Sequence, residues 1–321
     1  MTRTLLPILL TACTFSTPEE APDTGAVPLV TTGSGPVTGG TLAQVVDEFI
    51  QAPGAEVDVL FVVDNSSGMQ EEQVALAENI PYFLDFYLGS GLDYHIGVVS
   101  TDMADPTHSG QLRQIAGDRW LHDQTADPVN VLSQMILLGT NGSDEERGRD
   151  AAHSALVTLA GGANAGFLRP NSSLSVIVLS DEDDGSSNIS HIDWVAWLQG
   201  EQANRPSVTL NAIVEFDDGL QYIDATNAVG GVLWDIDGGD YDEPVEQIGM
   251  ATSGLVQEFP LTEIPVLGTI AVEVEDEGVV YMFASEVDWQ YNLDHNAIVF
   301  TEFVPSALST IRVSYAAEPP S

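Results

Sequence analysis

Residues 57–69 read VDVLFVVDNSSGM, and this segment indicates the fold class of the chain. It begins with a run of β-branched and aromatic residues, which is typical of a strand buried on both faces of a parallel sheet. The run ends at Asp64, and a polar turn precedes a helical pattern that extends from Met69 to Leu88. Asp64 and Ser66 are therefore predicted to lie at the carboxyl end of a strand, where open α/β sheets bind ligands. Their carboxylate and hydroxyl oxygens are of the kind that Mg²⁺ and Ca²⁺ prefer.

Apolar segments and helical patterns alternate from Val57 to about Leu261. The other predicted strands of this region are Asp93–Asp102, Leu174–Leu179, Val208–Val214 and Val232–Ile236, with Gly110–Ile115 as a candidate antiparallel edge strand. The other predicted helices are Pro128–Leu138, Glu145–Leu159, Ile192–Leu198 and Glu243–Val256, the first with Asp127 as a candidate N-cap. This alternation predicts an α/β fold with a doubly wound, mostly parallel sheet over residues 51–262.

The pattern changes at about Ile264, where helical periodicity ends. Apolar and polar residues then alternate, as at Ile270, Val272 and Val274, and turn signals separate short apolar segments. The further predicted strands are Val279–Phe283, Ala297–Phe300 and Ile311–Tyr315. We therefore expect a small all-β, sandwich-like module over residues 263–321, of roughly sixty residues and near the lower size for independent folding.

The amino terminus carries the one cysteine of the chain, Cys13. Arg3 gives a positive start, Leu5–Leu10 is apolar, and Leu-Thr-Ala precedes the cysteine. This resembles a bacterial lipoprotein signal peptide, residues 1–12, with lipidation of Cys13 after cleavage; the alternative is a chance cysteine in an ordinary secretory signal. The resemblance implies a protein of the bacterial cell envelope, held at the outer membrane or cell surface by its acyl chains. No later segment has the ~20 apolar residues of a membrane-spanning helix.

Residues 13–50 are rich in Thr, Ser, Pro, Gly and acids. Such a composition cannot bury a core, so we interpret this region as a flexible tether. Its last residues, Thr41–Ile50, are a candidate amphipathic lead-in to the folded region.

The chain is strongly acidic, with 49 Asp and Glu against 8 Lys and Arg, and a formal net charge of -41. Nucleic-acid binding needs a basic surface, so nucleic acid is excluded as a partner. Docking on anionic lipid through protein charge is disfavoured for the same reason, which leaves the N-terminal lipid as the expected membrane contact. We interpret the acidity as adaptation to salty surroundings, where screening reduces self-repulsion, rather than as cation storage.

Three polar loops are predicted to meet at one edge of the sheet. They are Asp64–Gly68, Gly142–Ser143 ahead of the helix that contains Gly148, and Leu179–Asp181. In order, spacing and context these loops resemble the von Willebrand factor A family, over Val57 to Leu261 or about two thirds of the chain. Two flanking segments, EEQVALAENIPYFL and LDYHIGVVSTD, resemble bacterial surface lipoproteins of that family.

The family carries a metal-ion-dependent adhesion site, built from an Asp-x-Ser-x-Ser loop, a Thr and a further Asp. The resemblance implies that a divalent cation (Mg²⁺, Mn²⁺ or Ca²⁺) is held here by Asp64, Ser66, Ser67, Ser143 and Asp181. Ser143 stands where the family usually has Thr, and Thr140 is the alternative. The first loop departs from the motif because Gly68 occupies the position of its second serine. Either Ser67 turns inward, or a water fills the position, or the site is weakened.

The resemblance implies a binding protein and not an enzyme. Two carboxylates and neutral hydroxyls leave a dication with an open coordination position, which a carboxylate of a protein or extracellular-matrix ligand can occupy. Two other functions stay open: a structural surface lipoprotein with a vestigial metal site and, less favoured, a metal-assisted hydrolase, for which no general base is evident. Taken singly, Asp64 could be a helix N-cap and Asp181–Asp184 a solvated loop.

Overall fold

The computed structural model describes residues 42–51, 56–88, 90–276, 278–301, 304–306 and 308–317. The predicted signal peptide, Cys13 and the tether up to residue 41 lie outside the described residues, so lipidation stays a prediction. Within the described residues, no helix combines the length and apolar character needed to cross a membrane.

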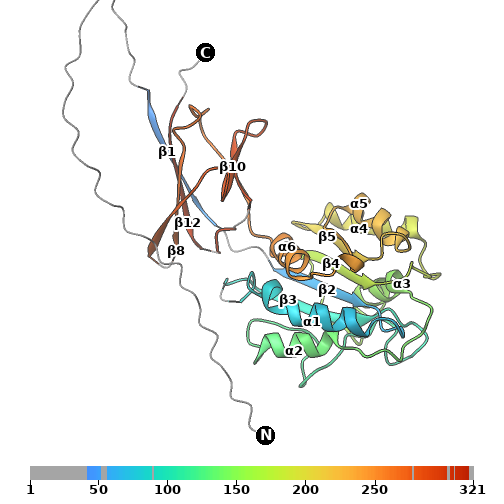
Figure 1. Cartoon of the computed structure of the whole chain (residues 1–321). Helices are drawn as coiled ribbons and strands as arrows, with labels where there is room; N and C mark the ends of the chain where they lie inside the picture. The colour runs from blue at the N-terminus through green and yellow to red at the C-terminus, as the bar shows by residue number, and fades with distance from the viewer. Residues whose placement is uncertain are drawn as a thin grey trace, which may run out of the picture. The chain divides into compact units, whose positions relative to one another are not determined.

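A five-stranded parallel sheet forms the centre of the first folded region (Figure 1). Its strand order is β3-β2-β4-β5-β6. The strands are β2 (Val57–Val63), β3 (Tyr94–Ser100), β4 (Ser173–Ser180), β5 (Val208–Val214) and β6 (Leu233–Asp235). The chain runs outward from β2 to β3 and then returns to β4 on the other side of β2, which makes the gap between β2 and β4 the switch point of the sheet.

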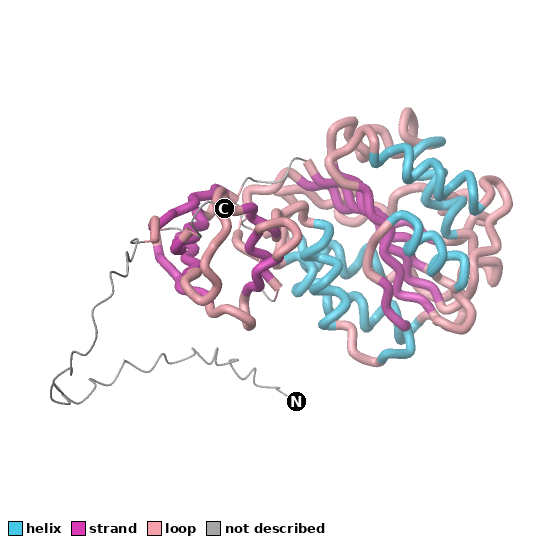
Figure 2. The backbone as a smooth tube through the Cα atoms, turned by 90° about the horizontal axis from the view of Figure 1, so that it is seen from above, coloured by secondary structure: helices cyan, strands magenta, loops and turns pink. Residues whose placement is uncertain are grey.

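Helices cover both faces of this sheet (Figure 2). The residues packed on one face come from α1 (Gln70–Leu84), α2 (Pro128–Ile136) and α6 (Asp242–Thr252). Those on the other face come from α3 (Gly148–His153), α4 (His191–Gln202) and α5 (Leu220–Val229). The α/β fold class with a doubly wound parallel sheet is thereby confirmed.

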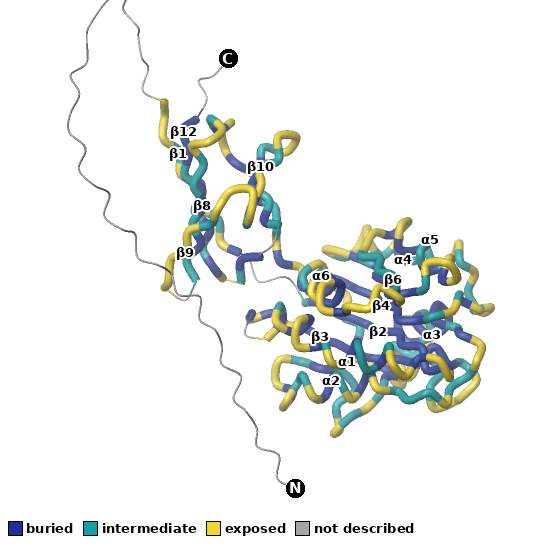
Figure 3. Tube along the Cα trace, viewed as in Figure 1, coloured by how far each residue is buried: buried dark blue, intermediate teal, exposed yellow. Residues whose placement is uncertain are grey.

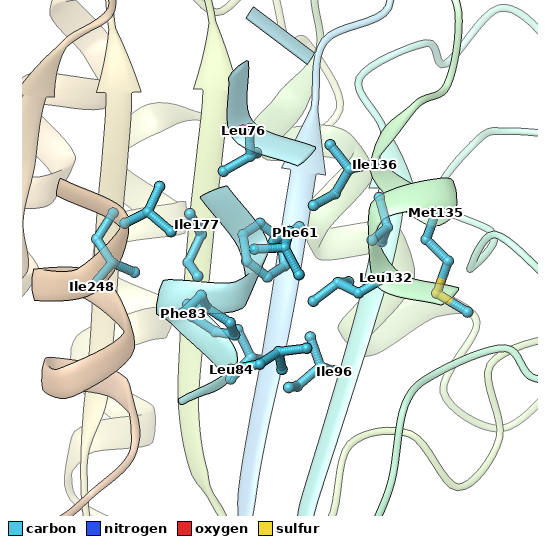
Figure 4. Packing of buried hydrophobic residues seen from close by; sticks show 14 of the residues in the cluster. Phe61, Leu76, Phe83, Leu84, Ile96, Leu132, Met135, Ile136, Ile177 and Ile248 are labelled. Carbon is cyan, nitrogen blue, oxygen red and sulfur yellow. The ribbon is translucent and has the colours of Figure 1, made fainter. Parts of the chain in front are cut away.

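The side chains of β2 divide the core into two layers, because successive residues of a strand point to opposite faces. Phe61 enters the layer under α1, where its ring lies 5.2 Å from that of Phe83 (Figure 4). Leu60 and Val62 enter the opposite layer. All seven residues of β2 are buried, and Figure 3 draws the strand in the buried colour. This explains why Val59–Val63 is continuously apolar and not alternating, while the buried Asp58 pairs with Arg169 at 2.7 Å.

Two antiparallel sheets form the all-β part of the chain and share one core. The first has the order β1-β12-β8-β9, built from β1 (Gln44–Ile50), β12 (Thr310–Ala316), β8 (Ala271–Asp276) and β9 (Val279–Phe283). The second has the order β10-β11-β7, built from β10 (Trp289–Asn292), β11 (Ala297–Phe300) and β7 (Glu258–Pro260). The predicted all-β module is therefore present, with strands from two separate parts of the chain: β1 precedes the parallel sheet in sequence, and β7 to β12 follow it.

Two boundaries differ from the sequence prediction. The interpretation of residues 13–50 as a tether is wrong for Gln44–Ile50, which pairs with β12 along its whole length. Its Val45 and Phe49 pack on the β-module core, so the short QVVDEFI segment carries an alternating strand pattern inside a polar region. The predicted end of the α/β region at residue 262 is also too late, because Glu258–Pro260 pairs with β11.

Several local predictions are wrong as well. Gly110–Ile115 forms no strand, although Arg113 N–H donates to Val98 O of β3 at 2.8 Å. The predicted helix 145–159 begins only at Gly148 and continues from α3 into a π-helical segment, Ser154–Thr158. Asp127 adopts a left-handed conformation (φ 51°) and its side chain makes no cap hydrogen bond to α2.

Candidate metal site at the carboxyl edge of the sheet

The candidate site lies where β2 and β4 end side by side. Val63 pairs with Leu179 in the parallel register, and the Asp64 N–H donates to Leu179 O at 2.9 Å. This register brings the first predicted loop and the third together at the switch point of the sheet, although more than 110 residues separate them in sequence.

The Asp64 carboxylate is fully buried and held in one orientation. Its Oδ1 accepts a hydrogen bond from Ser66 N–H at 2.7 Å, and its Oδ2 accepts one from Ser180 Oγ at 2.8 Å. Because each carboxylate oxygen has two lone pairs, both retain capacity for a further partner. Ser66 is buried beside it, whereas Ser67 and Gly68 are exposed.

Gln73 of α1 connects the first loop to the second. Its Nε2 donates to Asp64 O at 2.7 Å and to Gly139 O at 3.0 Å. The Gly142 N–H also donates to Asn65 O at 2.9 Å. A β-carbon at Gly142 would stand 2.4 Å from the Asn65 side chain, so only glycine permits this approach.

The second loop therefore lies against the first, with Ser143 next to this contact. Ser143 and its alternative, Thr140, are both half-buried. The Ser143 hydroxyl accepts a hydrogen bond from Glu145 N–H at 3.0 Å, which fixes the turn that leads toward α3.

Asp181 lies directly against the first loop. A β-carbon built at Gly68 would stand 2.6 Å from Asp181 Oδ2. The other oxygen, Asp181 Oδ1, is buried and has no hydrogen-bond donor among the described residues. Burial, and after it the charge of Asp64, raise the pKa of Asp181 to about 6.

Glu146 is a member of this cluster that the sequence reasoning missed. It is only 2% exposed, and its Oε2 accepts a hydrogen bond from Thr101 Oγ1. Its Oε1 is buried without a partner in the described part of the chain. Burial, and after it the charge of Asp64, raise the pKa of Glu146 to about 9. The signal in the sequence was its position between Ser143 and Gly148, inside the loop already chosen for a ligand.

Further acids increase the negative potential at this edge. The pKa of Glu182 is raised by burial first and then by the charges of Asp64, Asp218 and Asp144. In the described residues, no three or more His, Cys, Asp or Glu side chains converge closely enough to hold a metal ion by themselves. A cation at this edge would therefore need hydroxyl, backbone or water oxygens as well as carboxylates. The predicted ligands include only two acids, so they have the same requirement.

No family model matches the chain, and no curated protein matches it. Similar solved structures include a von Willebrand factor type A protein from Catenulispora acidiphila (TM-score 0.38, 13% identity, 87% of this chain and 66% of that one). They also include the pilus adhesin SpaC from Lactobacillus rhamnosus GG in an open conformation (TM-score 0.48, 10% identity, 85% of this chain and 40% of that one). A third is proximal thread matrix protein 1 from the mussel byssus (TM-score 0.41, 13% identity, 67% of this chain and 51% of that one). The chain thus spans between 40% and 66% of the lengths of these proteins, and the likeness is one of fold alone.

Proposed function

We propose that the chain is a cation-dependent binding protein of the bacterial cell envelope, anchored through lipid on Cys13. A divalent cation (Mg²⁺, Mn²⁺ or Ca²⁺) is held between β2 and β4 by Asp64, Ser66, Ser67, Ser143 and Asp181. One observation supports this most: beside the buried Asp64, Asp181 Oδ1 and Glu146 Oε1 are buried without a donor among the described residues. Buried carboxylates without donors or counter-ions are costly, and a dication removes that cost.

The cation gives an acidic protein a means of binding an acidic ligand. With a formal charge of -41, the chain repels carboxylates over most of its surface. A metal ion at the sheet edge offsets the negative charge of the carboxylates there and presents an open coordination position. We propose that a carboxylate of a protein or matrix ligand occupies that position, which gives adhesion and not catalysis.

The metal is tested by isothermal titration calorimetry of the full chain after dialysis against EDTA. Mg²⁺, Mn²⁺ and Ca²⁺ are titrated into the wild type and into Asp181→Asn, which keeps the shape of the side chain. Asp123→Asn serves as the control, because Asp123 is a 65% exposed acid of another loop. Thermal unfolding in EDTA verifies that the variants are folded.

We expect a saturable one-site heat in the wild type and in Asp123→Asn, and its loss in Asp181→Asn. Equal heats in all three proteins would show only counter-ion binding to an acidic surface, and absence of heat would favour a purely structural surface protein. The ligand is tested with a blocked Gly-Glu-Gly peptide, which should gain a binding component when the cation is added. This component should be lost in EDTA and in Asp181→Asn, and Gly-Gln-Gly should lack it.

A further inference from the structure

A second polar pocket lies at the end of β3, one strand beyond the metal loop. Its volume is about 290 Å³, and its walls come from the end of β3, the loop that follows it and the end of α2. The lining residues are Ser100, Thr107, His108, Gln111, Leu112, Arg113, Gln114 and Leu138. This volume is just below the ~300–1,000 Å³ of small-molecule sites, so the pocket can take one side chain or a small acid.

Arg113 is the charged group of this pocket, and it has no counter-ion among the described residues. Of the seven arginines in the described residues, five pair with a carboxylate within 4.0 Å, and Arg113 and Arg119 do not. Acids outnumber bases by 49 to 8, so an arginine without an acidic partner is the unusual case. Burial is the sole cause of a shift for Arg113: it lowers the pKa of the guanidinium.

The Arg113 guanidinium is held in place but keeps unused donors. Its main-chain N–H bonds to Val98 O of β3, and its Nη2 donates to Leu137 O at 3.1 Å. Its Nε is buried without an acceptor among the described residues. A fixed, partly desolvated guanidinium with free N–H groups matches the geometry of a carboxylate.

The neighbouring groups support an acceptor ligand. His108 Nδ1 is also buried without a hydrogen bond among the described residues, 3.7 Å from Asp102 Oδ2. The Asp102 Oδ1 is already used, because it accepts from Ala104 N–H and Asp105 N–H. The amide Nε2 groups of Gln111 and Gln114 donate to main-chain carbonyls, so Arg113 and His108 hold the unused nitrogens of the pocket.

We propose that this pocket binds a carboxylate, from either an acidic peptide side chain or a free small organic acid, through the unused N–H groups of Arg113. The pocket does not need the cation. It does contact the first loop of the candidate metal site, Asp64–Gly68, because the Ser100 hydroxyl in its wall donates to Asn65 Oδ1 at 2.6 Å.

The test follows the arginine Nε–Hε resonances of the full chain by NMR, after EDTA has removed the metal and has itself been dialysed away, because its own carboxylates would compete for the pocket. The probes are sodium acetate, acetamide, and the blocked peptides Gly-Glu-Gly and Gly-Gln-Gly, each against sodium chloride at equal ionic strength. Arg113→Gln removes the charge, and Arg113→Lys keeps the charge but lacks Nε. Arg119→Gln is the matched control, because Arg119 is the other arginine without an acid and it lies over the Trp120 ring.

We expect acetate and Gly-Glu-Gly to shift the Arg113 Nε–Hε resonance of the wild type saturably, with the Arg119 resonance unmoved. Because Arg113→Gln and Arg113→Lys lack that resonance, binding to them is followed at the main-chain amides of residues 111–114, and it should be weakened at least about tenfold in Arg113→Gln. Tighter binding of Gly-Glu-Gly than of acetate identifies a peptide ligand, and the reverse identifies a free acid. The proposal is overturned if chloride gives the same shifts, if Arg113→Gln and Arg113→Lys bind as well as Arg119→Gln, or if no probe saturates. Because no metal is present, a failure here is independent of a failure of the metal site.

Discussion

The Asp181 carboxylate lies in contact with the Gly68 backbone, at a distance that leaves no space for a side chain at residue 68. A β-carbon there would stand 2.6 Å from Asp181 Oδ2, well inside van der Waals contact. The adhesion motif that this loop resembles has serine at that position. In this chain, a side chain at residue 68 would collide with Asp181 in its observed position. The glycine therefore allows the third loop to approach the first.

Replacement of Gly68 by alanine should therefore weaken cation binding without unfolding the protein. The added methyl displaces the Asp181 carboxylate, and we expect at least a ~10-fold loss of Mn²⁺ affinity, or about 1.4 kcal/mol. Titration calorimetry measures the affinity. Gly200→Ala is the control, because Gly200 lies in α4 and a β-carbon there would meet no atom of another element within 4 Å. That change should leave affinity intact and add about 0.5–1 kcal/mol of stability. Wild-type affinity in Gly68→Ala would exclude Asp181 as a ligand in its observed place.

Asp181 should make the metal-free protein less stable as the pH rises. Its pKa is raised to about 6 in the folded protein, so the folded state binds more protons than the unfolded state between about pH 4 and pH 6. The stability that this group contributes is complete below its unfolded pKa and is lost as the pH rises through about 6. We expect the melting temperature in EDTA to fall over this window, and the fall to be smaller in Asp181→Asn. A steeper fall in the variant would contradict the assignment.

Glu146 should also make the metal-free protein less stable as the pH rises, over a wider pH range than Asp181. At about pH 8 the unfolded chain has an ionised Glu146, whereas the folded protein, with a pKa of about 9, must take up a proton there. Glu146→Gln removes that requirement, so we expect a higher melting temperature in EDTA than the wild type at about pH 8, with little difference near pH 4. Thermal unfolding at the two pH values measures this.

The control for Glu146 is Glu182→Gln, in an exposed acid of the same edge. This change should raise the melting temperature in EDTA much less than Glu146→Gln does, because water screens an exposed charge. If Glu146→Gln destabilises the protein at both pH values, the Thr101 hydrogen bond outweighs the repulsion from Asp64.

The parallel sheet and the positions of Asp64 and Asp181 could be predicted because buried parallel strands give continuous apolar runs and end at one edge. Helix α5 was missed because its sequence, LQYIDATNAV, is rich in residues with weak helix propensity. Its buried residues Tyr222, Ala225, Thr226 and Val229 nevertheless have helical spacing, which was the available signal.

Three features of the structure depend on tertiary contacts that no local sequence pattern predicts. The Asp181–Gly68 contact depends on the pairing of β2 with β4, and no local pattern shows how far the third loop then reaches. The buried Glu146 likewise accepts a hydrogen bond from Thr101, which lies 45 residues earlier. Strand β1 was hidden because its partner β12 is more than 250 residues away, and a seven-residue strand beside a polar region has little signal of its own.

Asp47 of β1 should be essential for the β-module, although the sequence placed it in a tether. It is only 7% exposed and accepts hydrogen bonds from Tyr315 Oη at 2.8 Å, Thr262 N–H at 2.9 Å and Thr262 Oγ1 at 2.7 Å. Asp47→Ala leaves these donors unpaired, and we expect a loss of about 1–3 kcal/mol. Hydrogen exchange of the β12 amides should accelerate accordingly. The adjacent Glu48→Gln removes only an exposed pair with Arg312 and should cost less than about 1 kcal/mol. Equal exchange rates in the two variants would mean that β1 does not stabilise the module.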